Sequence, residues 1–458
     1  MSVGDPPADI DIQARPTSSF RQAYAHSIVG TAVIAAMGVC SGVLTARLLG
    51  PVARGQLAML MLLPSLTIRI GNLGLTQAIA HLINPVRCGG RAVGPNAIVL
   101  ALLLGCAECC IGIPLLDVAL PNLPAYDRSA ALILMLLVPA TYVIYVLIGV
   151  DLGHGRFLRY SLYQALPVVL YVPILLALAL AGKTTARTFA LANLWAWLLV
   201  VGVRAPEALH LLLSGPVRIG DISRILISGF NLALPELAGL ALLRMDYPIL
   251  VRMVPADELG YYAVALAVGA GQSATANPVA QVCFHATSSA TDRRDGLEML
   301  AGQFRLLQPV FLLITIGSML VVPFLIKVAF GTQFLKSTTT AYWLIAAMSL
   351  WSCSQVLDHG LRGLGRGRLA AWSNIMGLGL ILSAGPLLVA RFGITGMGAA
   401  MCLAQAVSLA AKLLLLNRGN TVRATDFWGL NRPTLMRIVT HLGIVWRSRV
   451  HTQHHTAQ

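Results

Sequence analysis

The chain carries the stretch Arg47-Leu-Leu-Gly-Pro-Val-Ala-Arg-Gly55-Gln-Leu-Ala58, and a similar stretch, Arg252-Met-Val-Pro-Ala-Asp-Glu-Leu-Gly260-Tyr-Tyr-Ala263, follows 205 residues later. In both, a glycine comes eight residues after an arginine, and the stretch links two long apolar segments. A second pair, Gly153–Ser161 and Gly365–Ser373, repeats at an offset of 212 residues. Two matches at nearly one offset predict a duplicated membrane unit, which is typical of transporters that hold substrate between two halves.

The composition excludes a soluble protein. Of the 458 residues 57% are hydrophobic and 11% are charged, and the mean hydropathy is +0.76, whereas soluble domains carry about 25% charged residues. The formal charge of +15 is spread over many short links, which argues against a nucleic-acid partner. The first 23 residues are polar and show no cleavable signal peptide. The eight cysteines lie mostly in apolar segments, so we expect packing roles and neither a metal site nor a cofactor.

The apolar runs predict an all-α polytopic membrane protein, since about 20 apolar residues cross a bilayer core of about 30 Å. Twelve transmembrane helices are expected near 24–46, 56–83, 96–116, 129–150, 161–181, 187–203, 225–251, 259–284, 304–326, 339–361, 370–390 and 394–416. They divide the chain into an N-terminal tail, a six-helix half, a cytoplasmic connector, a second six-helix half and a basic tail, at 1–23, 24–203, 204–224, 225–416 and 417–458. Because six is even, a pseudo-two-fold axis along the membrane normal should relate the halves.

The distribution of lysine and arginine predicts the orientation. Of the 33 residues of these two types, 21 fall on the side of the N-terminus, nine on the opposite side and three within predicted helices. This bias places both termini in the cytoplasm and both arginine–glycine stretches outside. The basic tail reads equally as an amphipathic segment on the inner leaflet or as a disordered segment.

Ionisable residues inside predicted helices are the candidate site residues, because such groups are costly in a bilayer unless they face a cavity or a partner. Arg69 lies at the middle of the second helix and either binds an anionic substrate group or pairs with Glu108 or Glu236. In the seventh helix, Arg244 and Asp246 lie about 80° to either side of Glu236. We expect Arg69 and Arg244 to bind substrate and Glu236 or Asp246 to take up a coupling ion; the alternative is a solvated wall without a binding role.

Other residues are predicted to have structural or gating roles. Arg47 and Arg252 are expected to cap helix ends, to contact head groups or to act at the outer gate. Gly55 and Gly260 are expected to allow close packing of the backbone beside them. Lys412 is expected to extend its ammonium to the cytoplasmic surface, and Glu108 could be a protonated acid against a neighbouring helix.

Three stretches resemble those of a known family. Leu49-Gly50-Pro51 followed by Arg54-Gly55, the small-residue run Gly71–Leu75, and the segment Asp246–Tyr262 are similar to the signatures of bacterial polysaccharide flippases. These flippases belong to the multidrug/oligosaccharidyl-lipid/polysaccharide (MOP) exporter superfamily. Pro248 departs from the family pattern and predicts a kinked or locally unwound seventh helix.

The resemblance implies a flippase of the bacterial inner membrane that moves an undecaprenyl-pyrophosphate-linked oligosaccharide by alternating access, coupled to an ion. It implies membrane lipids and the lipid-linked oligosaccharide as partners, with glycan polymerase machinery as a further candidate. A multidrug/cation antiporter of the same superfamily is the alternative. A polysaccharide polymerase or ligase is disfavoured because the extracytoplasmic links are too short for such a site, so we expect no enzymatic activity.

Overall fold

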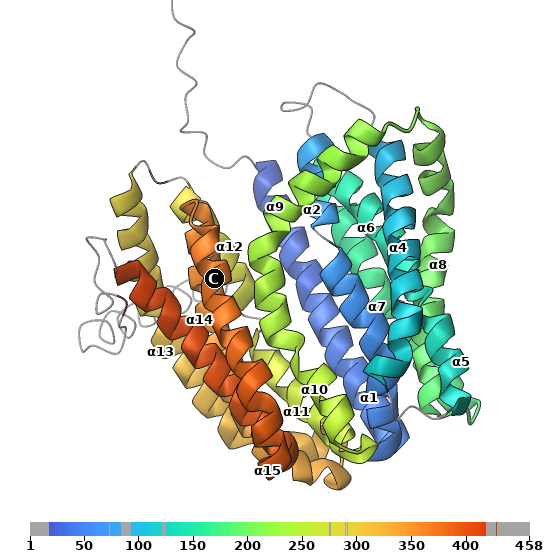
Figure 1. Cartoon of the computed structure of the whole chain (residues 1–458), viewed down its shortest axis with the longest axis vertical. Helices are drawn as coiled ribbons and strands as arrows, with labels where there is room; N and C mark the ends of the chain where they lie inside the picture. The colour runs from blue at the N-terminus through green and yellow to red at the C-terminus, as the bar shows by residue number, and fades with distance from the viewer. Residues whose placement is uncertain are drawn as a thin grey trace, which may run out of the picture.

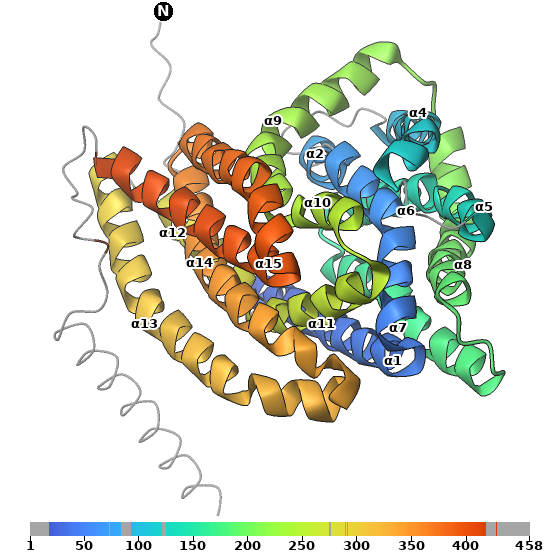
Figure 2. The same ribbon diagram turned by 60° about the horizontal axis from the view of Figure 1, so that its bottom comes forward.

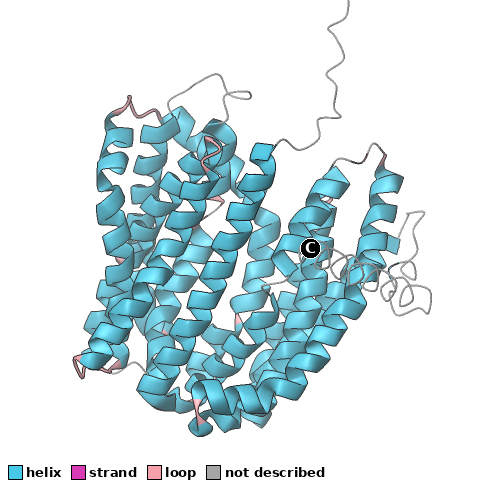
Figure 3. Ribbon diagram, turned by 180° about the vertical axis from the view of Figure 1, so that it is seen from behind, coloured by secondary structure: helices cyan, strands magenta, loops and turns pink. Residues whose placement is uncertain are grey.

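The computed structural model describes residues 18–72, 74–83, 93–120, 125–273, 276–288, 290, 292–417 and 427. Every regular element in these ranges is a helix, and Figure 3 draws no strand there. Seven helical stretches in the described residues are long and apolar enough to cross a membrane. This architecture agrees with the all-α membrane fold expected from the composition.

The first half of the chain contains a helix that reverses without a loop. α1 (Ser18–Gly71) turns at Gly50, whose φ of 71° lies in the left-handed region that glycine adopts without strain. Pro51 opens the second limb, where its missing N–H is not needed. The helices that follow are α2 (Leu75–Ile83), α4 (Val93–Ala119), α5 (Ala125–Leu134), α6 (Leu137–Gly153), α7 (Phe157–Leu180) and α8 (Ala186–Leu213).

The second half repeats this device at its end, where α15 (Gly367–Asn417) reverses at Gly393 with a φ of 58°. Before it come α9 (Ile219–Arg244), α10 (Asp246–Met253), α11 (Ala256–Ser273), α12 (Ala276–Ser288), α13 (Arg293–Leu325), the π-helix η1 (Ile326–Phe330), the 3-10 helix η2 (Thr332–Ser337) and α14 (Thr338–Gly363).

The two groups of helices converge at one end of the molecule. Figure 1 shows α1–α8 on one side and α11–α15 on the other, meeting where α1 reverses and where α10 gives way to α11. We call this the convergent end. Toward the opposite end the two groups draw apart, and Figure 2, turned to bring the convergent end forward, shows α11 lying along α1 there.

Where the structure describes them, the twelve predicted segments lie mostly on helices, but several boundaries differ, and helices end and begin again within 56–83, 129–150 and 225–251. The predicted connector 204–224 is largely helical, because α8 continues to Leu213 and α9 begins at Ile219. The predicted boundaries were placed where each apolar run ends. The helical hydrogen bonds continue beyond that point, through the first charged residues. Residues 1–17 of the predicted N-terminal tail and, apart from Phe427, residues 418–458 of the basic tail lie outside the described residues.

Candidate substrate cavity between the two halves

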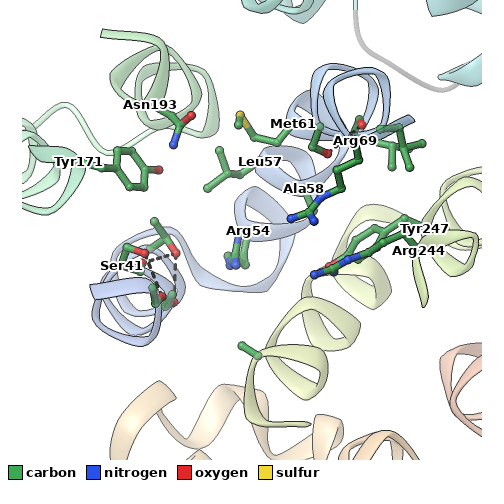
Figure 4. A pocket seen from close by; sticks show the side chains of 17 residues that line it. Ser41, Arg54, Leu57, Ala58, Met61, Arg69, Tyr171, Asn193, Arg244 and Tyr247 are labelled. Carbon is green, nitrogen blue, oxygen red and sulfur yellow. Dashed lines mark hydrogen bonds between the residues drawn. The ribbon is translucent and has the colours of Figure 1, made fainter. Parts of the chain in front are cut away.

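A cavity of about 340 Å³ lies between the halves. The N-terminal half lines it with α1, α7 and α8, and the C-terminal half with the end of α9, α10 and α11. Figure 4 shows its side chains at close range. The polar residues that line it are Ser41, Thr45, Arg54, Ser65, Arg69, Tyr171, Asn193, Arg244 and Tyr247.

Three arginines give this cavity its charge. Arg54 lies one turn after the reversal of α1, Arg69 lies further along the same limb, and Arg244 is the last residue of α9. Figure 4 shows their guanidinium groups directed into one space. Arg54 and Arg244 are half-buried and Arg69 is exposed to the cavity. The two predicted substrate-binding residues therefore line the same cavity from opposite halves.

These arginines form no ion pair in the part of the chain that the structure describes. No carboxylate there lies within ion-pair distance of the three, and the buried Nε atoms of Arg54 and Arg244 have no acceptor. Several lining hydroxyls bond to nearby backbone: Thr45 donates to the Ser41 carbonyl at 2.8 Å and Tyr171 to that of Phe189 at 3.2 Å. Unpaired guanidinium groups in a largely apolar cavity are suited to an anionic ligand.

Glu108 does not form the alternative bridge to Arg69. Its carboxylate accepts a hydrogen bond from the Tyr142 hydroxyl at 2.7 Å, and no ion pair joins it to Arg69 among the described contacts. The backbone of α1 passes close by, since a Cβ on Gly71 would overlap the Glu108 carboxylate. Of the two carboxylates considered as partners of Arg69, Glu108 is thus excluded.

Asp246 is enclosed and does not line the cavity. Its side chain is fully buried, Tyr262 donates to Oδ2 at 2.5 Å, and the Tyr247 backbone N–H donates to Oδ1 at 2.9 Å. It opens α10, where a carboxylate satisfies free N–H groups of the first turn. The interruption between α9 and α10 falls at Met245, three residues before Pro248, whose ring cannot donate to the carbonyl four residues earlier. The geometry thus gives Asp246 a role in positioning this break.

Glu236 lies within α9, but its side chain is outside the described residues. Its expected part in ion coupling stays a prediction.

Arg47 and Arg252 join the two halves at the convergent end. Arg47, at the end of the first limb of α1, donates to the carbonyls of Val328 and Ala329 in η1, the latter at 2.7 Å. Arg252, near the end of α10, donates to the carbonyl of Val118 near the end of α4 at 2.6 Å. Each arginine thus reaches the carbonyl end of a helix in the opposite half, where unpaired carbonyls favour a cation. We call these two contacts the arginine latch.

Two glycines between the latch contacts bring the halves into backbone contact. A Cβ on Gly55 would overlap the carbonyl oxygen of Ala256, and a Cβ on Gly260 would overlap that of Pro51. Residues 51 and 55 are each 205 positions before residues 256 and 260. A contact from i to j together with the matching contact from j to i is the mark of a two-fold relation. The repeat in the sequence is therefore also a repeat in the packing.

The prediction that Lys412 extends to the cytoplasmic surface is wrong. The Lys412 side chain is fully buried in α15 and forms an ion pair of 2.8 Å with Asp358 of α14. The sequence interpretation missed this because it treated Lys412 as a helix-end residue and did not consider Asp358 as a partner.

Arg54 is the charged residue of the cavity that was not proposed as a site from the sequence. It fell in the expected link between the first two helices, and links were read as structural. The signal was present, because an arginine directly before Gly55 places its side chain beside the closest approach of the halves. Cys106, Cys109 and Cys110 are free thiols, and the described residues contain no group of side chains able to hold a metal ion.

Comparisons with known proteins connect the chain to transporters through structure. No protein-family model matches the sequence, and no curated protein is significantly similar to it. The fold resembles the lipid II flippase MurJ in an inward closed conformation at 12% identity and a TM-score of 0.68, over 87% of this chain and 88% of that one. It resembles an inward-facing multidrug resistance MATE transporter of the MOP superfamily at 13% identity and a TM-score of 0.69, over 85% and 97%.

A third structure, that of the MATE multidrug transporter DinF-BH, matches at 14% identity and a TM-score of 0.62, over 91% and 97% of the two chains. At these identities the likeness concerns the fold. The chain is a polytopic all-α membrane protein with the fold of MOP-superfamily transporters, as the sequence resemblance predicted. These structures are of transporters and a flippase.

Proposed function

We propose that this protein is a flippase that moves an undecaprenyl-pyrophosphate-linked oligosaccharide across the bacterial inner membrane by alternating access, coupled to an ion. The observation that carries the proposal is the cluster of Arg54, Arg69 and Arg244, without described carboxylate partners, in a cavity between the halves. A pyrophosphate presents several anionic oxygens, which forked guanidinium donors bind well.

The size of the cavity supports a head-group site. Its volume of about 340 Å³ is at the lower end of the range of about 300–1,000 Å³ for small-ligand sites. It suits the pyrophosphate and the first sugar, while the remaining sugars and the polyprenyl chain extend beyond it. The resemblance to the lipid II flippase supports a lipid-linked substrate, because that protein has the same fold.

The arginine latch supports the transport cycle. With the predicted orientation, the convergent end faces outward, so the structure represents a state closed to the outside. Opening the outer side requires Arg47 and Arg252 to leave the carbonyls of the opposite half. We therefore assign Arg47, Arg252, Gly55 and Gly260 to the outer gate.

A multidrug/cation antiporter is the second candidate, because two of the similar structures are MATE transporters. The charge of the cavity argues against it. Three arginines repel a cationic drug, and no carboxylate lines the cavity among the described residues.

Binding by the purified protein tests the proposal. We expect undecaprenyl pyrophosphate to raise the melting temperature of the wild-type protein in detergent and to lose this effect in Arg69→Ala and Arg244→Ala. Arg391→Ala is the matched control, because Arg391 is exposed on α15 and does not line the cavity. Undecaprenyl phosphate and a cationic rhodamine dye complete the panel. Stabilisation by the dye, or equal stabilisation by undecaprenyl pyrophosphate in both arginine variants, would refute the proposed function.

A further inference from the structure

A buried ion pair lies in the second half, outside the residues that line the cavity. Asp358 and Lys412 are 2.8 Å apart, with side chains 10% and 0% exposed. The ammonium also donates to Ser354 Oγ and to Asn374 Oδ1, the latter at 2.9 Å. Asn374 in turn donates to Asp358 Oδ2 at 3.3 Å and accepts from Ser408 at 2.8 Å. The pair thus joins α14 to both limbs of α15.

The first half carries a counterpart. Asp151 at the end of α6 and Arg204 in α8 lie 2.8 Å apart, and both side chains are 2% exposed. From Asp151 to Asp358 is 207 residues, and from Arg204 to Lys412 is 208, close to the offsets of the sequence repeat. Each half therefore joins equivalent helices by one buried carboxylate and one buried cation.

Protonation of the aspartate would affect the two ion pairs differently. Arg204 has a second carboxylate, Glu207, at 2.5 Å, which also binds Arg159, and its guanidinium stacks on Tyr163. Protonation of Asp151 would leave Arg204 still paired. Lys412 has one carboxylate among the described residues, so protonation of Asp358 would remove its counter-charge. A lysine, unlike an arginine, also exchanges its proton readily when buried.

The surroundings of the second pair are otherwise mostly neutral. Arg362, one turn beyond Asp358, is the other charged group that acts on Lys412, and the titratable His359 follows Asp358 directly. The packed helices bring uncharged groups. α9 places Gly239 beside Asn374, α12 places Thr287 against Gly363, and α13 places Leu300 against Gly360. The Asp358 side chain is 10% exposed.

We propose that Asp358 binds the coupling proton, with Lys412 as the partner that it releases. This inference rests on the ion-coupled transport proposed above and identifies the ion and its site. A proton from water adds to a carboxylate oxygen of Asp358, the ion pair to the Lys412 ammonium breaks, and the site gains one positive charge. Loss of the proton to water restores the pair. Ionisable groups inside a membrane domain commonly serve as such proton sites.

A continuous path joins this site to the arginine latch. α14 begins at the convergent end directly after η2, and η1 just before it carries the carbonyls that Arg47 binds. When the ion pair breaks, α14 loses its charged link to α15 and can move against it. A displacement of α14 at its first turn shifts η1 away from Arg47 and opens the outer gate.

Nitroxide labels at Val52 and Phe392 report this movement. The two residues belong to opposite halves, lie next to the reversals of α1 and α15, and are 53% and 63% exposed. Labels attached through encoded keto amino acids leave the native cysteines in place. Double electron–electron resonance then measures the distance between them in nanodiscs, without substrate, from acid to alkaline pH.

For the wild-type protein, we expect a lower pH to increase the population with separated labels, by up to about tenfold per pH unit, the limit for one proton. Asp358→Asn should remove this response, Asp358→Glu should restore it, and Asp151→Asn should leave it unchanged. A wild-type protein without a pH response, or an Asp358→Asn variant that titrates like it, overturns the proposal.

If Asp358→Asn does not fold, Lys412→Met decides the question. Lys412→Met lacks the ion pair at every pH, so the separated population should stay high throughout and the pH response should be lost; a wild-type response overturns the proposal. Since no lipid is added, a negative result in the binding experiment of the proposed function leaves this measurement interpretable.

Discussion

Removal of the arginine latch should open the convergent end. Arg47 donates two hydrogen bonds to carbonyls of the opposite half and Arg252 donates one. Both side chains are exposed, so we take about 1 kcal/mol for each bond, in the range for solvated hydrogen bonds. Arg252→Ala should then favour the open state by about 1 kcal/mol, Arg47→Ala by about 2 kcal/mol, and the double variant by about 3 kcal/mol.

In populations, about 3 kcal/mol corresponds to a change on the order of a hundredfold in the ratio of open to closed molecules. The labels at Val52 and Phe392 measure this ratio directly. The matched control is Arg128→Ala: Arg128 pairs with Asp117 at 2.6 Å near the convergent end, but both residues belong to the first half. Arg128→Ala should leave the ratio unchanged.

A double variant that keeps the wild-type distance distribution, or an Arg128→Ala variant that shifts it as far, would contradict the role of the latch. The first outcome would mean that the backbone contact at Gly55 and Gly260 determines closure, and the second that the shift is not specific to contacts between the halves.

Three further outcomes follow from the packing and the charges. Gly55→Ala and Gly260→Ala place a Cβ on a backbone carbonyl of the other half. Each should disfavour the closed state by about 1–3 kcal/mol, which would be measured as longer distances between the labels. The control Gly317→Ala, whose Cβ would meet no neighbour, should leave these distances unchanged. Arg54→Ala should abolish stabilisation by undecaprenyl pyrophosphate as fully as Arg69→Ala, and retained stabilisation would remove Arg54 from the site. Lys412→Ala should lower the free energy of unfolding by about 3–5 kcal/mol because it strands a buried carboxylate, and the double variant Asp358→Leu with Lys412→Met should recover most of that loss in thermal melts.

The sequence predicted the helices and their duplication because these depend on long apolar runs and on a repeated motif, both of which are local in the chain. It also indicated Arg69 and Arg244 as candidate site residues, because a charged side chain within an apolar run is costly unless it faces a polar cavity. The breaks at Gly50 and Gly393 were harder, because a helix that reverses without a loop leaves only one glycine as its signal.

Partners in space could not be read from the sequence. Lys412 and Asp358 are 54 residues apart, and only the packing of α14 on α15 brings them together. The targets of Arg47 and Arg252 are backbone carbonyls, which have no signature in a sequence. Asp246 could be recognised as a carboxylate within an apolar run, but the sequence does not show that its oxygens accept hydrogen bonds from Tyr262 and from the turn that opens α10.

The tight reversal of α1 at Gly50 limits how the topology of this protein can be mapped. A reporter domain or epitope tag inserted there would separate Gly50 from Pro51 and push apart the helices α1 and α11, which meet at Gly55. Residues 214–218, between α8 and α9, are mostly exposed and not helical, so they can accept an insertion. A fusion at that site, assayed for alkaline phosphatase or fluorescence, would report which face of the membrane the link occupies without disturbing the folded bundles.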